Sequence, residues 1–377
     1  MTRRSKRWKS RLLVMLGGLF LSLMFCEVVL RLENVFSGKS FFTDVRNKLN
    51  RPLKPLVPFR TFGPDFYEVH DEKVFIVSSR GETYPLNKAP HTFRIVCMGG
   101  STTENRAGHT GTHYPLELQK LLRRRFKNYR FEVINAGYSA YATPHSLILF
   151  ELDVLSWHPD LVIISHNIND RSVIYWPNFR FDYSNKYSHP FYQFPNYQSR
   201  FTTTNLLFQH FEFYWFLKDW LNQKKFSTAR YQLRQRSYGD SVPKLAAAVF
   251  ERNLRSFQTL AAANHITVVF GSQPIFPNEE VFLKTSQRPY NNVVVYPMFH
   301  EYVAHHKIYN RIIEKVAKST GSFFVDNDKI FDGNPSYFVD NVHYSKSGIK
   351  KLAQNYASLL EHILQEKSSS PSLPGPS

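Results

Sequence analysis

The sequence predicts an α/β domain with a doubly wound, mostly parallel sheet, preceded by one membrane-spanning helix. Two observations carry this prediction. From residue 93 onward, short apolar runs alternate with segments in which apolar residues recur at helical spacing. Before them, one long apolar segment follows a basic N-terminus. Strands that alternate with helices are typical of a parallel sheet covered on both faces.

Composition narrows the class of protein. The chain has 377 residues, of which 42% are hydrophobic and 21% charged, and its net charge is +18. These values exclude a wholly disordered chain, a collagen-like repeat and a polytopic membrane protein. Two cysteines exclude a disulfide-stapled scaffold. Six cations belong to the N-terminal flank and no nucleic-acid-binding motif is present, so we expect no nucleic-acid partner.

No cofactor or metal is expected either, because the sequence holds no P-loop, no G-x-G-x-x-G and no zinc-like Cys/His spacing. His300 and His305 are five residues apart and would lie on different faces of a helix, unlike the i, i+4 histidine pair of a zinc site. We expect His305 and His306 on the surface of that helix.

The N-terminus has the pattern of a signal-anchor. Residues 1–11 contain six Lys or Arg, and the apolar segment 12–30 is interrupted only by Glu27. Nineteen helical residues span about 28 Å, close to the thickness of a bilayer's hydrocarbon core. A basic flank stays in the cytoplasm. The sequence therefore predicts a single-pass protein of the inner membrane with the rest of the chain extracytoplasmic, in the periplasm.

Three alternatives to an uncleaved anchor fit less well. A cleaved signal peptide needs small residues at its cleavage site, which Ser22–Met24 and Phe25–Glu27 do not supply. A lipoprotein signal needs a small residue before Cys26, where the sequence has Phe25. An ordinary buried helix does not account for the six preceding cations. Glu27 lies near the outer end of the segment, where an acid costs less than at mid-bilayer.

The remainder divides into a connector, a domain and a tail. Residues 31–90 are expected to form an extracytoplasmic connector with one strand or hairpin near Lys73–Ser78. Residues 91–366 are expected to form the domain, and the Ser/Pro-rich residues 367–377 a disordered tail. The predicted strands are Phe93–Met98, Phe131–Asn135, Leu161–Ser165, Ile266–Gly271 and Ser322–Asp326. The predicted helices are Tyr114–Phe126, 143–157, Lys244–His265, 296–319 and Ser345–Gln365.

Residues 171–243 interrupt this alternation and are interpreted as an insertion. Residues 171–240 contain 21 aromatic residues, and ten Lys or Arg against four Asp or Glu. The insertion follows a strand at the carboxyl edge of the predicted sheet, where ligand sites of such folds form. It is either a small satellite core or a ligand platform, and the sequence leaves both open.

Four short polar segments follow predicted strands or precede the closing helix. They are Gly99–Thr103, Asn135–Gly137, Asn167–Asp170 and Asp340–His343. A serine in a Gly-rich strand-to-helix turn can expose its hydroxyl beside backbone N–H groups. An Asp three residues before a His can orient the imidazole and stabilise its charged form. Together these types suggest nucleophilic catalysis at one edge of the sheet.

In this order, the blocks FRIVCMGGSTT, VINAGYS, VIISHNIND and VDNVHYSKSGIKKLA resemble the SGNH (GDSL-like) hydrolase family, in the branch whose first block reads GGST. The resemblance implies a flavodoxin-like three-layer α/β/α fold. It also implies that Ser101 is the nucleophile, His343 the general base and Asp340 the residue that holds His343. The implied oxyanion hole consists of the N–H groups of Ser101 and Gly137 and the side-chain amide of Asn169.

One position departs from the family pattern: Asn167 stands where the third block usually has Gly. Asn tolerates a left-handed backbone better than most residues, so the change is compatible with the fold. The predicted function is a membrane-anchored serine esterase acting on an acyl ester of a cell-envelope carbohydrate or lipid. The alternatives are an O-acyltransferase using the same residues and a non-catalytic carbohydrate-binding module.

Overall fold

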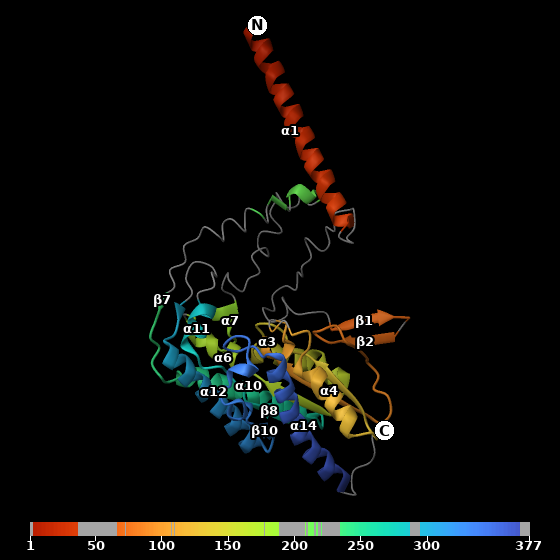
Figure 1. Ribbon diagram of the computed structural model, residues 1–377, viewed down its shortest axis with the longest axis vertical. Helices are drawn as coiled ribbons and strands as arrows, with labels where there is room; N and C mark the ends of the chain where they lie inside the picture. The colour runs from red at the N-terminus through yellow and green to blue at the C-terminus, as the bar shows by residue number, and fades with distance from the viewer. Residues whose placement is uncertain are drawn as a thin grey trace. The chain divides into compact units, whose positions relative to one another are not determined.

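The computed structural model describes residues 3–36, 66–187 (apart from 72, 107, 109 and 177), parts of 208–220, 234–286 and 295–369 (Figure 1). The chain divides into two compact units. One unit comprises Met1–Leu56, Tyr187–Gln232 and Pro289–Val294, and the other comprises Val57–Lys186, Leu233–Arg288 and Val295–Ser377.

The second unit is built on a five-stranded sheet in which every pairing is parallel. Its strands are β4 (Thr92–Gly99), β5 (Arg130–Asn135), β6 (Leu161–Ser165), β8 (Thr267–Gly271) and β10 (Phe323–Val325). Their spatial order is β10-β8-β6-β4-β5. The chain leaves β4 toward β5 and then returns to the other side through β6, so the order reverses between β4 and β6. The predicted doubly wound α/β fold is confirmed.

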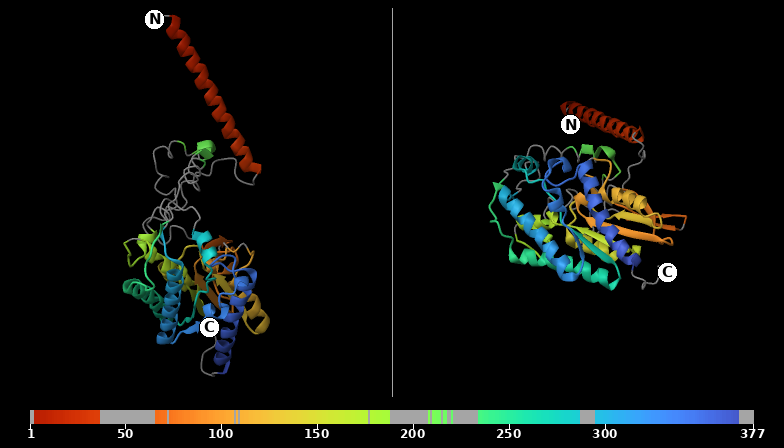
Figure 2. Two further views of the ribbon diagram at one scale, coloured as in Figure 1. Left: turned by 60° about the vertical axis from the view of Figure 1, so that its left-hand side comes forward. Right: turned by 60° about the horizontal axis from the view of Figure 1, so that its bottom comes forward.

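Helices cover both faces of this sheet, as Figures 1 and 2 show. On one face α4 (Tyr114–Arg125) packs against α14 (Lys346–Ser369). On the other face α10 (Lys244–Ala263) packs against α5 (Thr143–Leu152) and α12 (Phe299–Thr320). Strands β4 and β6 are buried along their whole length, because both of their faces meet helices.

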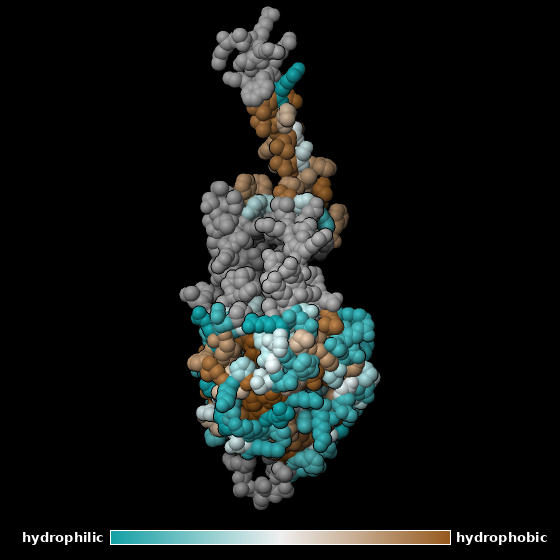
Figure 3. Space-filling view, turned by 90° about the vertical axis from the view of Figure 1, so that its left-hand side faces the viewer, coloured by the Kyte–Doolittle hydropathy of each residue, from teal (hydrophilic) through white to brown (hydrophobic). Residues whose placement is uncertain are grey.

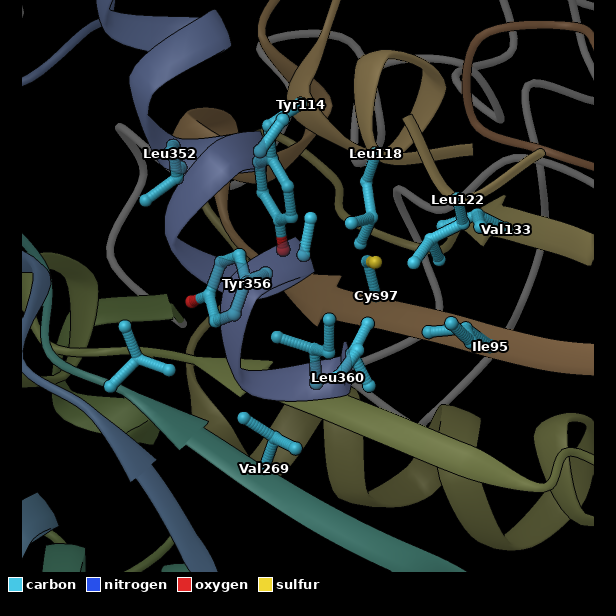
Figure 4. Packing of buried hydrophobic residues seen from close by; sticks show 14 of the residues in the cluster. Ile95, Cys97, Tyr114, Leu118, Leu122, Val133, Val269, Leu352, Tyr356 and Leu360 are labelled. Atoms are coloured by element: carbon cyan, nitrogen blue, oxygen red, sulfur yellow. The ribbon is translucent and has the colours of Figure 1, made fainter. Parts of the chain in front are cut away.

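The core between α4, α14 and the sheet is apolar and aromatic. Cys97 of β4 lies among Tyr114 and Leu118 of α4 and Tyr356 and Leu360 of α14 (Figure 4). All five side chains are buried. Burial raises the pKa of the Cys97 thiol above its usual range, so this cysteine acts as a small apolar core residue, as its position in the sequence predicts.

Shorter elements complete the α/β unit. They are the helices α3 (Ser101–Glu104), α6 (Ile168–Arg171), α7 (Ser184–Tyr187), α11 (Glu279–Ser286) and α13 (Asn327–Phe331), the 3₁₀ turns Val154–Trp157, Ser172–Tyr175 and Pro335–Tyr337, and the parallel pair β7 (Arg234–Gln235) and β9 (Val295–Tyr296). The predicted insertion is therefore divided between the two compact units. Residues 171–186 and 233–243 belong to the α/β unit, whereas 187–232 belong to the other unit.

The end of the predicted connector is part of the α/β unit. Strands β1 (Tyr67–His70), β2 (Lys73–Val77) and β3 (Thr83–Pro85) form an antiparallel sheet, where the sequence suggested one strand or hairpin. The Tyr84 hydroxyl donates to the Val133 carbonyl of β5 at 3.1 Å. The compact unit thus begins well before residue 91.

In the first unit, α1 (Arg3–Phe36) extends beyond the predicted segment 12–30 at both ends. Residues Arg11–Phe36 form a helix long and apolar enough to cross a membrane. In Figure 3 the described part of α1 is mostly brown, the colour of hydrophobic residues. At the other terminus, α14 continues to Ser369, so the predicted disordered tail begins inside a helix; residues 370–377 lie outside the described part.

Candidate active site

A pair of glycines places Ser101 at the end of β4. Ser101 is the first residue of α3, and its backbone N–H therefore has no acceptor within that helix. A Cβ on Gly100 would lie 2.6 Å from Nδ2 of Asn169. Glycine is therefore required at position 100 for the nucleophile turn to approach the end of β6.

Ser101 is the end of a hydrogen-bonded chain of three side chains. Its Oγ lies 3.0 Å from Nε2 of His343, and Nδ1 of His343 lies 2.7 Å from Oδ2 of Asp340. The other oxygen of Asp340 accepts the backbone N–H groups of Val342 and His343, each at 2.8 Å. The structure thus brings together residues 242 positions apart in the sequence in the arrangement that the motif predicts.

The environment keeps the Asp340 carboxylate charged. Burial favours its neutral form, but the hydrogen bond and charge of His343 and the two backbone N–H groups outweigh that effect and hold the pKa of Asp340 below its usual value. An ionised Asp340 accepts a hydrogen bond from Nδ1–H of His343, and this leaves Nε2 facing Ser101 able to accept the hydroxyl proton.

Asn169 lies in α6, directly after β6, at the position where the strand order reverses. Its Nδ2 donates to the Tyr141 carbonyl at 2.9 Å, which leaves the second N–H of that amide without a protein acceptor among the described residues. Gly100 lies against the same amide. Ser101, His343, Asp340 and Asn169 therefore converge at the carboxyl edge between β4 and β6, where such folds bind ligands.

Gly137 has a different environment from the other predicted residues. Its N–H donates to Oδ1 of Asn135 at 3.0 Å, so this donor already has a protein acceptor. A Cβ at this position would lie 2.5 Å from Cβ of Thr103 and 2.8 Å from the Glu104 nitrogen. The glycine therefore lets the end of β5 pack against α3, and its predicted role as an oxyanion donor stays a prediction.

The turn after Gly137 contains a feature that the sequence did not signal. Tyr138 donates its N–H to the Gly99 carbonyl at 3.1 Å, and Tyr141 donates to Tyr138 at 3.0 Å. Between them Ala140 has a φ of 67°, in the left-handed region that alanine disfavours. Strained backbone held beside a reactive group is typical of functional sites. Alanine carries no sequence signature of this conformation, unlike glycine.

Asn167 adopts a conformation other than the predicted one. Its φ is −172°, which is extended backbone, so the left-handed tolerance of Asn is not used. Its Nδ2 instead donates to the His306 carbonyl at 3.0 Å and to Oδ1 of Asn310 at 2.8 Å. The side chain thus ties the end of β6 to α12, which a glycine could not do.

The prediction that His305 and His306 lie on a helix surface is wrong. Both are completely buried, because this face of α12 packs on the end of the sheet. Nε2 of His306 lies 2.6 Å from the Gln273 carbonyl. Burial holds the pKa of His306 well below its usual value, so the imidazole is neutral. Among the described residues no group of three or more His, Cys, Asp or Glu could hold a metal ion.

Gln273 joins two of the blocks and was not singled out from the sequence. It follows β8, and its Nε2 donates to Oγ1 of Thr102 at 2.8 Å. Its Oε1 accepts the backbone N–H of Ile168 at 2.8 Å. One buried amide thus fixes α3, which carries Ser101, relative to α6, which carries Asn169. A lone glutamine after a strand has no pattern by which the sequence could reveal this role.

Lys186, at the end of the first part of the insertion, lies behind Asn169. Although it is only 1% exposed, its Nζ donates to the Asn169 carbonyl at 3.1 Å and to Oγ of Ser172 at 2.6 Å. Burial lowers the pKa of Lys186 to about 7, against the opposing effect of Asp170. Burial likewise raises the pKa of Asp170 to about 6, against its hydrogen bonds from Thr143. This segment therefore holds the backbone of Asn169 through the bonds of Lys186.

The sequence profile of the GDSL-like lipase/acylhydrolase family matches residues 97–351, about two thirds of the chain. The chain belongs to this family. It is accordingly an ester-hydrolysing enzyme with an SGNH-type α/β fold. No curated protein matches the sequence.

Several solved structures resemble this member of the family in fold at low sequence identity. An α/β hydrolase from the metagenome of Lake Arreo is 15% identical over 71% of this chain and 94% of its own, with a TM-score of 0.41. An acetylxylan esterase from Geobacillus stearothermophilus is 17% identical over 71% and 93%, with a TM-score of 0.41. A GDSL-like lipase from Bacteroides thetaiotaomicron is 18% identical over 72% and 88%, with a TM-score of 0.38.

Proposed function

We propose that the protein is a membrane-anchored, extracytoplasmic serine esterase that hydrolyses an acyl ester of the cell envelope, on a carbohydrate or a lipid. The observation that carries the chemistry is the chain from Ser101 Oγ to His343 Nε2 at 3.0 Å and from His343 Nδ1 to Asp340 Oδ2 at 2.7 Å. A serine hydroxyl is a weak nucleophile at neutral pH, and a hydrogen-bonded base held by a carboxylate is what activates it.

The reaction proceeds in two halves. In the first, Ser101 Oγ attacks the ester carbonyl while His343 Nε2 takes its proton; the C–O bond to the alcohol breaks as His343 returns that proton to the leaving oxygen. This gives an acyl-serine. In the second, His343 takes a proton from water, the hydroxide attacks the acyl carbon, and Ser101 leaves with the proton. The acid is released and the enzyme regenerated.

The negative oxygen formed in both halves needs preorganised donors. The Ser101 backbone N–H and the second N–H of the Asn169 amide are the donors that we assign to it. Each such donor contributes about 2.7–4 kcal/mol to stabilising the transition state. The N–H of Gly137 could join them only by leaving Oδ1 of Asn135, with which it is bonded at 3.0 Å.

The proposed anchor is α1, whose residues Arg11–Phe36 satisfy the length and apolarity of a membrane span. The cations that precede it in the sequence favour a cytoplasmic N-terminus. An alkaline phosphatase fusion after residue 40 tests this orientation, because the phosphatase is active only outside the cytoplasm. An inactive fusion would contradict it.

The chemistry is tested with the full chain in detergent. Ser101→Ala and His343→Ala are expected to lose hydrolysis of a short-chain aryl ester, and Ser101→Ala to lose labelling by a serine-reactive fluorophosphonate. Ser358→Ala and His362→Ala, exposed positions on α14, are matched controls that should retain both. Labelling that survives Ser101→Ala would remove Ser101 from the nucleophile's role. Acyl transfer to an added glycan faster than hydrolysis would favour the O-acyltransferase alternative.

A further inference from the structure

A short piece of the insertion is hydrogen-bonded to α1 within the first unit. The Glu27 carboxylate accepts the backbone N–H groups of Glu212 and Phe213 at 2.9 and 2.7 Å. Nη2 of Arg31 donates to the His210 carbonyl at 2.7 Å and pairs with Glu27 at 2.6 Å. Glu27 is only 5% exposed, so this acid of the apolar segment has its charge and both oxygens engaged.

These bonds fix the depth of residues 210–213 relative to the bilayer, if α1 spans it. With Arg11 at one boundary, Glu27 lies about 24 Å and Arg31 about 30 Å further along a helix. The hydrocarbon core is about 30 Å thick. Arg31 therefore lies at the outer boundary of the core, and Glu27 lies just inside it. Backbone groups bonded to them must lie at that same boundary.

The segment held there carries an apolar stripe. Residues 212–214, 216–217 and 220 are helical. Phe213, Phe216, Leu217 and Trp220 follow the spacing i, i+3, i+4, i+7, which places them on one face of a helix. Phe216, Leu217 and Trp220 are between 39% and 52% exposed, and Phe208 and Phe211 just before them are 46% and 45% exposed.

We propose that the described residues between 208 and 220 form an interfacial membrane element, which lies in the outer boundary of the bilayer, is bonded to α1 through Glu27 and Arg31, and places Phe216, Leu217 and Trp220 in contact with lipid. This inference rests on the membrane anchor of the proposed function. A helix with one apolar aromatic face at headgroup depth buries that face at the acyl boundary. Trp and other aromatic side chains are favoured at that depth.

These hydrogen bonds of Glu27 and Arg31, called the latch here, also satisfy polar groups whose burial would otherwise be energetically unfavourable. An unpaired carboxylate within hydrocarbon is energetically unfavourable, and the partners of Glu27 offset that cost. The N–H groups of Glu212 and Phe213 begin a helix and have no intrahelical acceptor, so Glu27 satisfies them where water is scarce. The insertion therefore contributes a second membrane contact in addition to its support of Asn169.

The test places a fluorescent label on the stripe of the full chain. In a Cys26→Ser background, with Cys97 buried and unreactive, Phe216→Cys is labelled with an environment-sensitive dye. The protein is reconstituted in vesicles of phosphatidylcholine with a minority of phosphatidylglycerol. We expect blue-shifted emission that is largely lost with lipids carrying a nitroxide near the headgroup. Ser358→Cys, on the exposed face of α14, is the control and should show neither effect.

A second variant tests the latch. Glu27→Gln is expected to expose the label at 216 to water while the protein resists carbonate extraction; Glu33→Gln, an exposed acid of the same helix, should leave the label quenched. With Glu27 intact, a label at 216 that is exposed to water in protein that resists extraction would overturn the interfacial element but keep the anchor. Protein released by carbonate would overturn the anchor itself. Quenching that persists in Glu27→Gln would overturn the latch. Ester hydrolysis, measured on the same samples, reports separately on the chemistry.

Discussion

The amino and carboxyl edges of the five-stranded sheet both carry polar side chains, but these side chains differ in whether all their hydrogen-bonding groups have protein partners. Toward the amino edge, Arg94 of β4 is 0% exposed, and its three guanidinium nitrogens bind Glu132 and the carbonyls of Pro85, Leu86 and Trp157. At the carboxyl edge, Ser101, His343 and Asn169 are only partly buried and retain a hydroxyl and an N–H directed to no further protein group among the described residues.

The polar groups at the amino edge have protein hydrogen-bond partners for all their donors, whereas those at the carboxyl edge keep donors that a ligand can use. A buried ion pair whose donors are all satisfied fastens secondary structure but cannot bind a ligand. A chain of hydrogen bonds that ends in a half-exposed serine can react with one. Substitutions at the amino edge should therefore alter stability without altering turnover in the folded protein, and those at the carboxyl edge should do the reverse.

The largest expected effect is on turnover, from Asp340→Asn. The amide keeps the size of the side chain but can no longer hold the imidazole with Nε2 free to accept a proton, so kcat for ester hydrolysis should fall about 10³- to 10⁴-fold. The unfolding midpoint should change little. Asp332→Asn, at an exposed position, is the matched control. A kcat within tenfold of wild type, a bound of about 1.4 kcal/mol, would remove Asp340 from the mechanism.

The reciprocal prediction concerns Arg94→Met. It leaves Glu132 charged and buried, so the free energy of unfolding in urea should fall by about 3–5 kcal/mol, while kcat per folded molecule stays unchanged. If the variant does not fold, the double variant Arg94→Met/Glu132→Leu is informative, because it removes both charges and should recover most of the loss. A double variant no more stable than the single one would show that the carbonyl contacts, and not the ion pair, dominate.

Lys186→Met tests whether the insertion supports the reactive edge. Loss of the bonds to Asn169 and Ser172 should let the Asn169 amide move. We expect kcat to fall about tenfold, because a displaced donor stabilises the transition state less while substrate binding is little affected. KM should change little. Lys318→Met, an exposed lysine on α12, controls for loss of charge. A change in KM alone, with kcat intact, would argue for a binding role instead.

The smallest effect is a pH dependence of stability from Glu82, in the turn between β2 and β3. Burial raises its pKa, but hydrogen bonds from His113 and Ser78 outweigh this and lower the pKa from 4.5 to about 2. Because the folded pKa is the lower one, this stabilisation is complete above pH 4.5 and is lost as the pH falls toward 2. Glu82→Gln should reduce the slope of unfolding free energy against pH in that window. An unchanged slope would mean that other carboxylates dominate it.

Several features of the site were readable from sequence because each has a local signature. The glycine pair before Ser101, the Asp340–His343 spacing and the apolar strand runs each reflect a constraint within a few residues. Gly137 shows the limit of such reasoning. A glycine after a strand signals close backbone approach, but only the packing shows that the approach is to Thr103 and that its N–H binds Asn135.

Roles that depend on residues far apart in the sequence could not be predicted from the sequence. Gln273, Asn167 and Lys186 are ordinary residues in the sequence, and their roles arise from contacts across at least 14 positions. His305 and His306 were misplaced for the same reason: helical spacing gives the faces of α12, but not which elements cover them. A similar limit applied to residues 66–90, whose strands pair with one another and pack on β5.

By itself, the sequence determined the parallel sheet, the family and three of the side chains in the reactive chain, because apolar period and motif spacing are local properties of the polypeptide. Only the tertiary structure decided which polar groups are saturated and which remain available. Hydrogen-bond satisfaction depends on every neighbour that folding brings within about 3 Å. For the same reason, only the structure shows that one part of the aromatic insertion contacts Asn169 and another part contacts α1.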